Sequence, residues 1–255
     1  WAVHFMGWHL YRGSPWTSPP GAAANLGWPT GTSVALTDSI PILAALLKPL
    51  DPVLPPTFQY IGFWLLLCYV LQGVFGVLVM RVLSPSMPAQ ILGASLIVMS
   101  PPLIGRFGHP ALSAHWLLLA AVWLYLRDTP QTSSACSQLV AWALVAGIAA
   151  ATHPYLALMV LIVMVAAHAR WVMVDSSAWR RAAARLSVLA TVAGLVLWQS
   201  GYFIVSEQGL RVSGFGEYSM NLLAPLMPAG TSLVFGAGPF SYATAGQYEG
   251  YAYLG

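Results

Sequence analysis

The sequence predicts an all-α membrane protein, a polytopic bundle of about six transmembrane helices, and three observations lead to that prediction. Hydrophobic residues make up 58% of the 255 residues and charged residues only 7%, whereas a soluble domain of this length needs far more charge to cover its surface. Long apolar runs with few charges recur along the chain, as membrane spans do. The Lys and Arg residues gather in alternate loops, which is typical of a chain that crosses a bilayer repeatedly.

Six apolar segments are expected to form the spans. They are residues 57–80, 88–105, 111–126, 138–151, 155–169 and 186–205. Several are shorter than the roughly 20 residues that an upright span needs, but short spans are tolerated where their ends are buried in a bundle or line a watery cavity. The pair Pro101-Pro102 is expected to end the second helix early, because proline breaks a helix interior.

The basic residues predict which loops are cytoplasmic. Residues 81–87, 127–137 and 170–185 hold six of the ten Lys and Arg residues: Arg81, Arg127, Arg170, Arg180, Arg181 and Arg185. The much longer remaining loops hold only Arg12, Lys48, Arg106 and Arg211. The first set is therefore expected on the cytoplasmic side, and the long segments 1–56 and 206–255 on the external side.

The first external segment is expected to carry a helix that lies at the membrane interface. The run "SIPILAALLKPL" (39–50) is apolar but too short to span. Pro41 suits the first turn of a helix, and Asp38 or Ser39 could cap it. Lys48 would then reach the lipid headgroups. A second interfacial helix is expected over residues 221–228.

Several other classes of protein do not fit this sequence. The net charge of +3 comes from scattered basic residues, so no nucleic-acid partner is expected. The two cysteines, Cys68 and Cys136, form no disulfide framework or metal motif. No Walker A loop, GxSxG, HExxH or complete GxGxxG sequence occurs, so neither nucleotide chemistry nor a Ser hydrolase elbow is predicted. The sequence specifies no cofactor, and it leaves the need for a divalent cation open.

The chain is expected to be one membrane domain over residues 1–255. It shows no internal repeat and no low-complexity linker. Residues 1–56 would form an external loop, residues 57–205 the six-span bundle, and residues 206–255 a second external segment. The start without Met and the abrupt end predict a fragment that lacks an N-terminal span and C-terminal spans.

Asp38, in "VALTDSIPIL", is the first candidate for a functional residue. One reading is structural: an Asp before a helix accepts backbone N–H bonds and favours the positive end of the helix dipole. The other is catalytic: a general base held at a helix start, at the boundary of water and lipid. The two readings are compatible, because a cap also fixes the position of a carboxylate.

The segment "GRFGHP" supplies a candidate anion site. Arg106 lies between glycines, which would let a phosphate approach closely and be held bidentately, although an Arg here could equally be an interfacial anchor. His109 could add a donor. His115 would lie inside a span, where an ionisable residue marks a cavity more often than it faces lipid, and it is expected to line the same pocket.

The C-terminal segment carries a second group of polar and aromatic residues. Glu207, Arg211, Glu217 and Glu249 lie among Tyr, Gly and Ser. They could form a solvated loop whose salt bridges contribute little. The same mixture of flat rings, amides and carboxylates is also what a sugar-binding surface needs, so Arg211 and Glu249 are candidate substrate contacts.

Several stretches resemble an uncharacterised family of bacterial polytopic membrane proteins that is grouped with the GT-C glycosyltransferases. They are "HFMGWHLYRGSPW", "TDSIPILAALLKPL", "FQYIGFWLLLCYVLQG", "GHPALSAHWLLLA", "YSMNLLAPLMP" and "GQYEGYAYLG". The resemblance covers nearly the whole chain. It implies a GT-C-like fold, with a large first external loop that carries interfacial helices and an acidic catalytic residue.

The resemblance also implies an activity: transfer of a sugar from a polyprenyl-phosphate carrier to a glycan or lipid hydroxyl, at the external face of the bacterial inner membrane. Many such enzymes place their acid directly after the first span, but residues 1–11 hold none. Asp38 is therefore expected to be the base. Arg106 would bind the phosphate, with Arg211 or Lys48 as helpers, and His109 and His115 would line the pocket.

Two alternatives come from other functional classes. A transporter or flippase for a lipid-linked or anionic substrate needs no general base, but it would need polar residues along a path through the bilayer, where this sequence has almost none. A non-catalytic membrane subunit would not depend on the Asp38 carboxylate. The sugar, the acceptor and the carrier lipid are not specified by the residues.

Overall fold

The computed structural model describes residues 2–127 except Trp28 and Thr30, residues 135–204, residues 222–227 and Gly246. In this part of the chain, helices dominate. The strands are two residues each, β1 (Ala22–Ala23) and β2 (Thr32–Ser33), and they pair antiparallel. The predicted all-α class is therefore confirmed.

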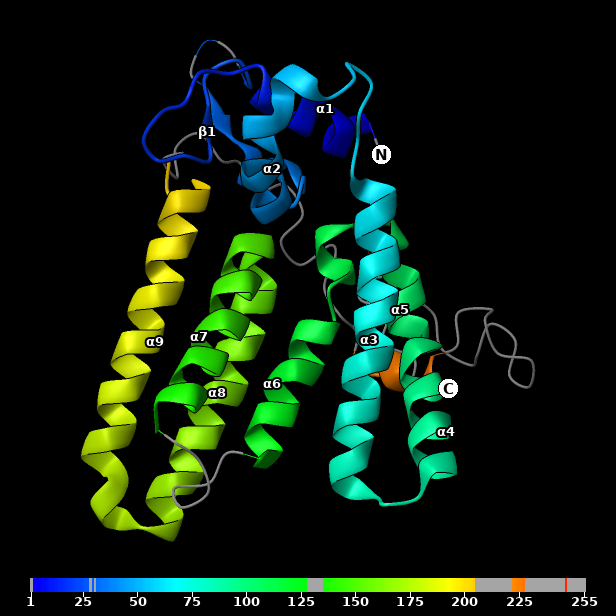
Figure 1. Cartoon of the computed structure of the whole chain (residues 1–255), viewed down its shortest axis with the longest axis vertical. Helices are drawn as coiled ribbons and strands as arrows, with labels where there is room; N and C mark the ends of the chain where they lie inside the picture. The colour runs from blue at the N-terminus through cyan, green and yellow to red at the C-terminus, as the bar shows by residue number, and fades with distance from the viewer. Residues whose placement is uncertain are drawn as a thin grey trace.

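Long helices run side by side along the molecule (Figure 1). They are α3 (Ile61–Leu83), α4 (Met87–Val98), α6 (Trp116–Arg127), α7 (Ala135–Thr152), α8 (Pro154–Val174) and α9 (Trp179–Ser200). α3 packs against α4 and α6, and α8 contacts α6, α7 and α9. Within the described residues, four segments are long and apolar enough to cross a membrane: Ile61–Leu83, Met87–Gly105, Pro154–Val174 and Ser176–Ser200.

The other two expected spans, α6 and α7, are shorter apolar helices. Pro101 and Pro102 act as predicted, because α4 ends at Val98 and a separate short helix, α5 (Pro101–Gly105), begins at the first proline. Two 3-10 turns, η3 (Arg106–Gly108) and η4 (Ala111–Ser113), then lead into α6. The third span was expected to begin at residue 111, but the regular helix begins only at Trp116.

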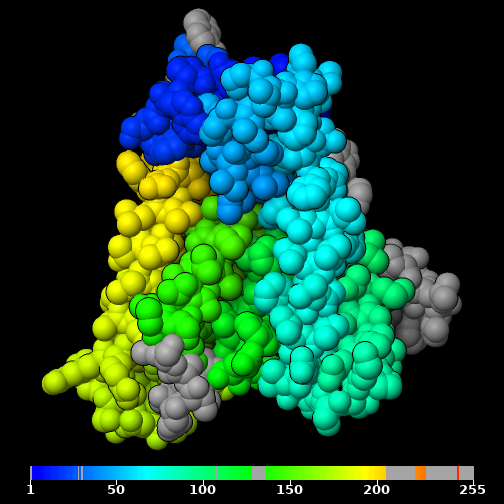
Figure 2. Space-filling model, in the orientation of Figure 1, coloured from blue at the N-terminus to red at the C-terminus, as the bar shows by residue number. Residues whose placement is uncertain are grey.

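Residues 2–60, which we call the N-terminal cap, cover one end of the bundle (Figures 1 and 2). The cap contains α1 (Ala2–Arg12), η1 (Val34–Thr37), α2 (Pro41–Leu47) and η2 (Lys48–Val53). The helix α1 was not predicted from the sequence; it is regular, with Gly7, Trp8, Tyr11 and Arg12 on its buried face. The expected short helix in 39–50 is present as α2, with Pro41 in its first turn.

Polar contacts hold the cap together. Arg12 pairs with the Asp51 carboxylate and also donates to the carbonyls of Pro55 and Leu54. Trp8 Nε1 donates to the Phe58 carbonyl at 3.0 Å. Because α1 contacts η1, α2 and η2, the cap is one packed unit rather than an open loop.

The cap is also fastened to the end of α9. The Gly21 N–H donates to the Gln199 carbonyl at 2.8 Å, and Ser33 Oγ donates to the Ser200 carbonyl at 2.9 Å. A side chain at Gly21 would collide with the Ser200 backbone, so glycine is needed for this close approach. Gly201 ends α9 with φ 87°, in the left-handed region that favours glycine.

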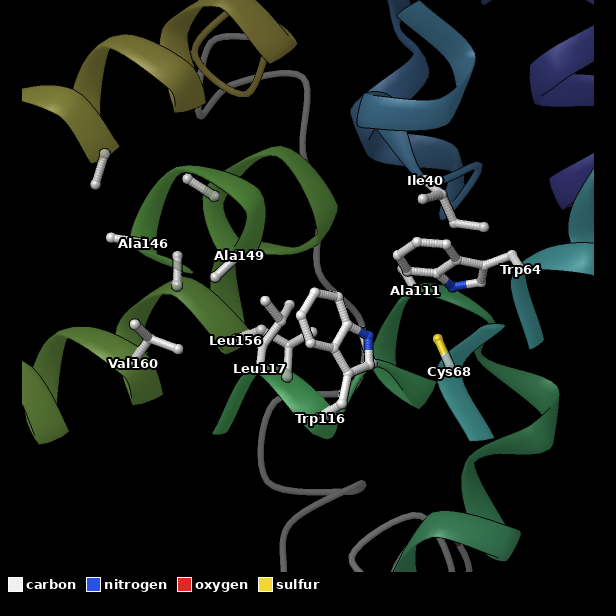
Figure 3. Packing of buried hydrophobic residues seen from close by; sticks show 14 of the residues in the cluster. Ile40, Trp64, Cys68, Ala111, Trp116, Leu117, Ala146, Ala149, Leu156 and Val160 are labelled. Carbon is white, nitrogen blue, oxygen red and sulfur yellow. The ribbon is translucent and has the colours of Figure 1, made fainter. Parts of the chain in front are cut away.

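Small residues allow the helices to approach closely, as in membrane bundles. Gly76 of α3 lies against Ala94 of α4. Ala146 and Ala149 of α7 are buried beside Leu156 and Val160 of α8 (Figure 3). Large apolar side chains are instead exposed on the outer faces of the helices, among them Leu66, Ile162 and Leu195. Apolar exteriors on helices of spanning length are what a protein needs in order to lie in lipid.

Candidate functional site

Side chains from distant parts of the chain converge on Asp38 at the capped end of the bundle. Asp38 Oδ2 lies 3.8 Å from Nδ1 of His4 in α1 and 3.8 Å from Nδ1 of His109, the residue that ends η3. Tyr202 lies just after the end of α9, and burial, followed by the negative charge of Asp38, raises the pKa of its phenol. Three separate segments thus bring two imidazoles and a phenol toward one carboxylate.

The backbone around Asp38 turns sharply. Asp38 has φ 54° and Ile40 has φ 52°, both in the left-handed region, which is unfavourable for a β-branched residue such as Ile. Contacts on both sides hold the turn in place. Ile40 is fully buried near Trp64 and Ala111 (Figure 3), and Tyr60 Oη donates to the Ser39 carbonyl.

Asp38 does not cap the helix that follows it. It is the C-cap of η1, the N-cap of α2 is Ile40, and α2 has no side-chain cap. Ser39 does not cap α2 either, because its hydroxyl donates to the His4 carbonyl at 2.8 Å. The capping reading of Asp38 is therefore wrong, because the left-handed turn points the carboxylate away from the first N–H groups of α2.

The Asp38 carboxylate is buried without a satisfying hydrogen bond. Its side chain is 17% exposed. No donor among the described residues forms a hydrogen bond of normal geometry with either oxygen, and the Ala111 N–H is only a weak neighbour of the carboxylate. Burial raises the pKa of Asp38 above its ordinary value, while His4, His109 and the Ala111 N–H act in the opposite direction. A carboxylate with a raised pKa and open acceptor positions is chemically suited to take up a proton.

The turn that carries His109 is held rigidly. Trp64 Nε1, on α3, donates to the Pro110 carbonyl at 2.8 Å. Ser113 Oγ donates to the Arg106 carbonyl at 3.2 Å. A side chain at Gly108 would meet no atom within 4 Å, so there is open space beside this backbone. The His109 side chain is 43% exposed, which makes it the accessible member of the group.

Arg106 and two further histidines, His115 and His153, belong to the neighbouring segments, and each histidine is affected by a charge of the Arg106–His109 turn. Arg106 begins η3, and its positive charge acts on His115. His115 was expected inside a span, but it lies just before α6 begins. His153 is the N-cap of α8, where its Nδ1 accepts from the Tyr155 N–H at 3.2 Å. Burial, followed by the nearby His109, lowers the pKa of His153 to about 4.

Three predicted site residues do not belong to the described centre. Lys48 was expected at the headgroups, but it is only 4% exposed. Its ammonium lies over the rings of Tyr11 and Trp16, 4.0 and 4.6 Å from their centroids, since a buried cation is best accommodated by aromatic faces. Arg211 and Glu249 lie outside the described residues. Residues 222–227 are described, and they hold a short 3-10 turn, η7 (Ala224–Leu226), in place of the interfacial helix expected over residues 221–228.

His4 and Tyr202 were not predicted to be site residues. A signal for His4 was present, because His4, Trp8 and Tyr11 follow the spacing of one helix face. That spacing identifies a buried face, but it does not reveal which segment the face meets. No sequence pattern predicted that Tyr202 lies near Asp38, since only the path of α9 through the bundle brings it there.

A separate apolar pocket of about 190 Å³ lies at the same end of the molecule. Its walls come from α2, the last turns of α7 and α9, and the loop at Pro20 and Gly21. Pro41 and Ile42 line it, so it lies close in sequence to the Asp38 turn. In the described part of the chain, no group of three His, Cys, Asp or Glu side chains is arranged to hold a metal ion.

The fold and the site together define an all-α membrane protein with a carboxylate–histidine centre at one end of its bundle. The chain belongs to the family described as "Domain of unknown function (DUF6311)", whose model matches residues 1–255. Comparison with curated proteins found no match, and comparison with solved structures found no match either.

Proposed function

We propose that this protein is a membrane glycosyltransferase that moves a sugar from a polyprenyl-phosphate carrier to an acceptor hydroxyl. The observation that carries this proposal is the Asp38 carboxylate, which is buried, lacks a hydrogen bond of normal geometry among the described residues and faces two histidines. Arg106 lies in the same short turn as His109, which faces Asp38, so this turn carries a cation capable of binding phosphate.

The chemistry of this reaction suits these groups. The acceptor oxygen attacks the anomeric carbon of the sugar, the bond from that carbon to the phosphate oxygen breaks, and the lipid phosphate leaves with the electron pair. The proton of the acceptor hydroxyl passes to Asp38. Arg106, with His109 as a second donor, stabilises the negative charge that grows on the departing phosphate. No nucleotide site is needed for such a donor.

Two further features support a lipid-linked donor. The apolar pocket beside the Asp38 turn offers room for part of a hydrocarbon chain. Arg81, Arg127 and Arg181 lie at the ends of α3, α6 and α9 that are opposite the cap (Figure 1). If all six apolar helices are spans, the positive-inside rule places the Asp38 centre at the external face, and in a bacterium at the outer surface of the inner membrane.

The test is an assay of purified protein in lipid nanodiscs with a panel of labelled polyprenyl-phosphate sugars. Asp38→Asn keeps the size of the side chain and tolerates a left-handed backbone, so it removes the base without removing the turn. We expect kcat to fall by about 10²–10⁴-fold. Asp175→Asn, at an exposed position beside η5, is the matched control and should leave kcat unchanged. Unchanged turnover in D38N would overturn the proposal.

A further inference from the structure

His4 contacts both the Asp38 turn and the turn that carries His109. Its Nδ1 lies 3.2 Å from the Thr37 carbonyl, and its Nε2 lies 3.3 Å from the Gly108 carbonyl. The same Nδ1 faces Asp38 Oδ2 at 3.8 Å. One side chain on α1 therefore connects the Asp38 turn to the turn that carries Arg106 and His109.

The two carbonyls define the protonation state that suits this position. A carbonyl oxygen can only accept a hydrogen bond, and a neutral imidazole has only one N–H. Only the doubly protonated ring can donate to the Thr37 and Gly108 carbonyls together. The imidazolium also places its positive charge beside the Asp38 carboxylate, which strengthens both bonds, since charge-assisted hydrogen bonds are the stronger kind.

We infer that His4, as an imidazolium, is a positioning residue that holds the Asp38 carboxylate against the Arg106–His109 turn. The catalytic role of His4 rests on the proposed function, because the base and the phosphate-binding groups must be held in place to act on one substrate. The contacts themselves do not depend on that function, so they can be tested separately.

Hydrogen–deuterium exchange of the full chain in nanodiscs tests the contacts. Protection factors of peptides covering residues 34–40 and 104–113 should fall by about tenfold in His4→Gln at pH 6, equivalent to ~1.4 kcal/mol. His9→Gln, on the exposed face of the same helix, should behave like the unmodified protein. If H4Q matches the unmodified protein in both peptides, the inference is overturned.

Kinetics test the positioning role. In H4Q, kcat should fall by about tenfold while KM stays close to that of the unmodified protein, because His4 positions the base and does not bind substrate. H9Q should keep both values. Transfer by the unmodified protein with an unchanged kcat in H4Q would overturn the inference and leave the proposed function intact. Absence of transfer by the unmodified protein would overturn the proposed function, and the exchange experiment would still decide whether His4 holds the two turns together.

Discussion

The Asp38 carboxylate lowers the free energy of unfolding, because it is a buried charge without a full set of hydrogen bonds. The two positive φ angles at Asp38 and Ile40 add backbone strain. The turn persists because Ile40 is fully buried and because Tyr60 and Ser39 bind its backbone and that of α1. Strain and unpaired charge at one site are typical of positions kept for function.

Replacement of Asp38 should therefore stabilise the protein. Burial raises the pKa of Asp38, so its contribution to folding is most favourable at low pH and is lost as pH rises through that raised pKa. Asp38→Asn should raise the free energy of unfolding by about 1 kcal/mol at pH 7. The gain should vanish near pH 3, where Asp38 is protonated. Thermal unfolding of both proteins in detergent across this range measures the difference, and a D38N protein less stable than its parent at pH 7 would contradict it.

His153 should produce the opposite dependence on pH. Its pKa is lowered to about 4, so its stabilising contribution is present above the ordinary value of 6.5 and is lost as pH falls toward 4. In His153→Asn the new side chain can still cap α8, but it cannot take up a proton. The unmodified protein should therefore lose about 2 kcal/mol relative to H153N between pH 7 and pH 4. Equal losses in the two proteins would show that His153 is not the group responsible.

Residue chemistry could be predicted from the sequence better than residue partners could. Asp38, Arg106 and His109 stand out as polar groups in an apolar chain, and the structure brings Asp38 and His109 together. Lys48 is likewise a charged residue in an apolar stretch, yet it is enclosed by Tyr11 and Trp16. Local sequence gives the type of a side chain, whereas its exposure depends on which distant rings pack around it.

Among the secondary-structure elements, α1 depends on one very close approach. A side chain at Gly7 would collide with the hydroxyl groups of Thr37 and Ser39, which lie 2.7 Å apart and form part of the Asp38 turn. Glycine at this position lets the helix lie directly on that turn. The distance between α1 and the Asp38 turn is therefore set by the missing side chain.

Gly7→Ala should push α1 away from the Asp38 turn and destabilise the protein by about 1–3 kcal/mol. Gly13→Ala is the matched control, because its new methyl group would meet only the His9 carbonyl, 3.9 Å away, and should have little effect. Thermal unfolding compares the two variants, and hydrogen exchange of residues 34–40 locates the change. If G7A and G13A are equally stable, the close packing of α1 does not limit stability.

The long apolar helices were predictable as elements, and the cap was predictable only in part. Long apolar runs identified α3, α8 and α9 without knowledge of their partners. The helix α1 was missed because its buried face is made of Gly7, Trp8, Tyr11 and Arg12, a mixture that differs from an ordinary apolar stripe. Its burial depends on Asp51 and Phe58, which bind Arg12 and Trp8 from far along the chain.

At the scale of the whole molecule, the proposed external position of the Asp38 centre can be tested with the native cysteines. Cys68 is buried and Cys136 is exposed near the start of α7, at the end opposite the cap (Figure 1). In intact spheroplasts, a membrane-impermeant thiol reagent should leave Cys136 unlabelled and a permeant reagent should label it. Labelling of Cys136 by the impermeant reagent would reverse the orientation.

A second cysteine gives the complementary measurement. Val53 is 79% exposed in η2 of the cap. In a Cys136→Ser background, Val53→Cys should react with the impermeant reagent from outside the spheroplast. Failure of V53C to react, together with reaction after the membrane is opened, would place the Asp38 centre on the cytoplasmic side and exclude an external donor.

The junction between Ser33 and Ser200 joins residues that are 167 positions apart. During synthesis, the early residues must wait until α9 has been made before Gly21 and Ser33 find their acceptors at Gln199 and Ser200. The assembly of the Asp38 centre is thereby coupled to completion of the helical bundle. A nascent chain interrupted before α9 would expose an incompletely folded N-terminal cap, a form that quality-control proteases can distinguish from the mature protein.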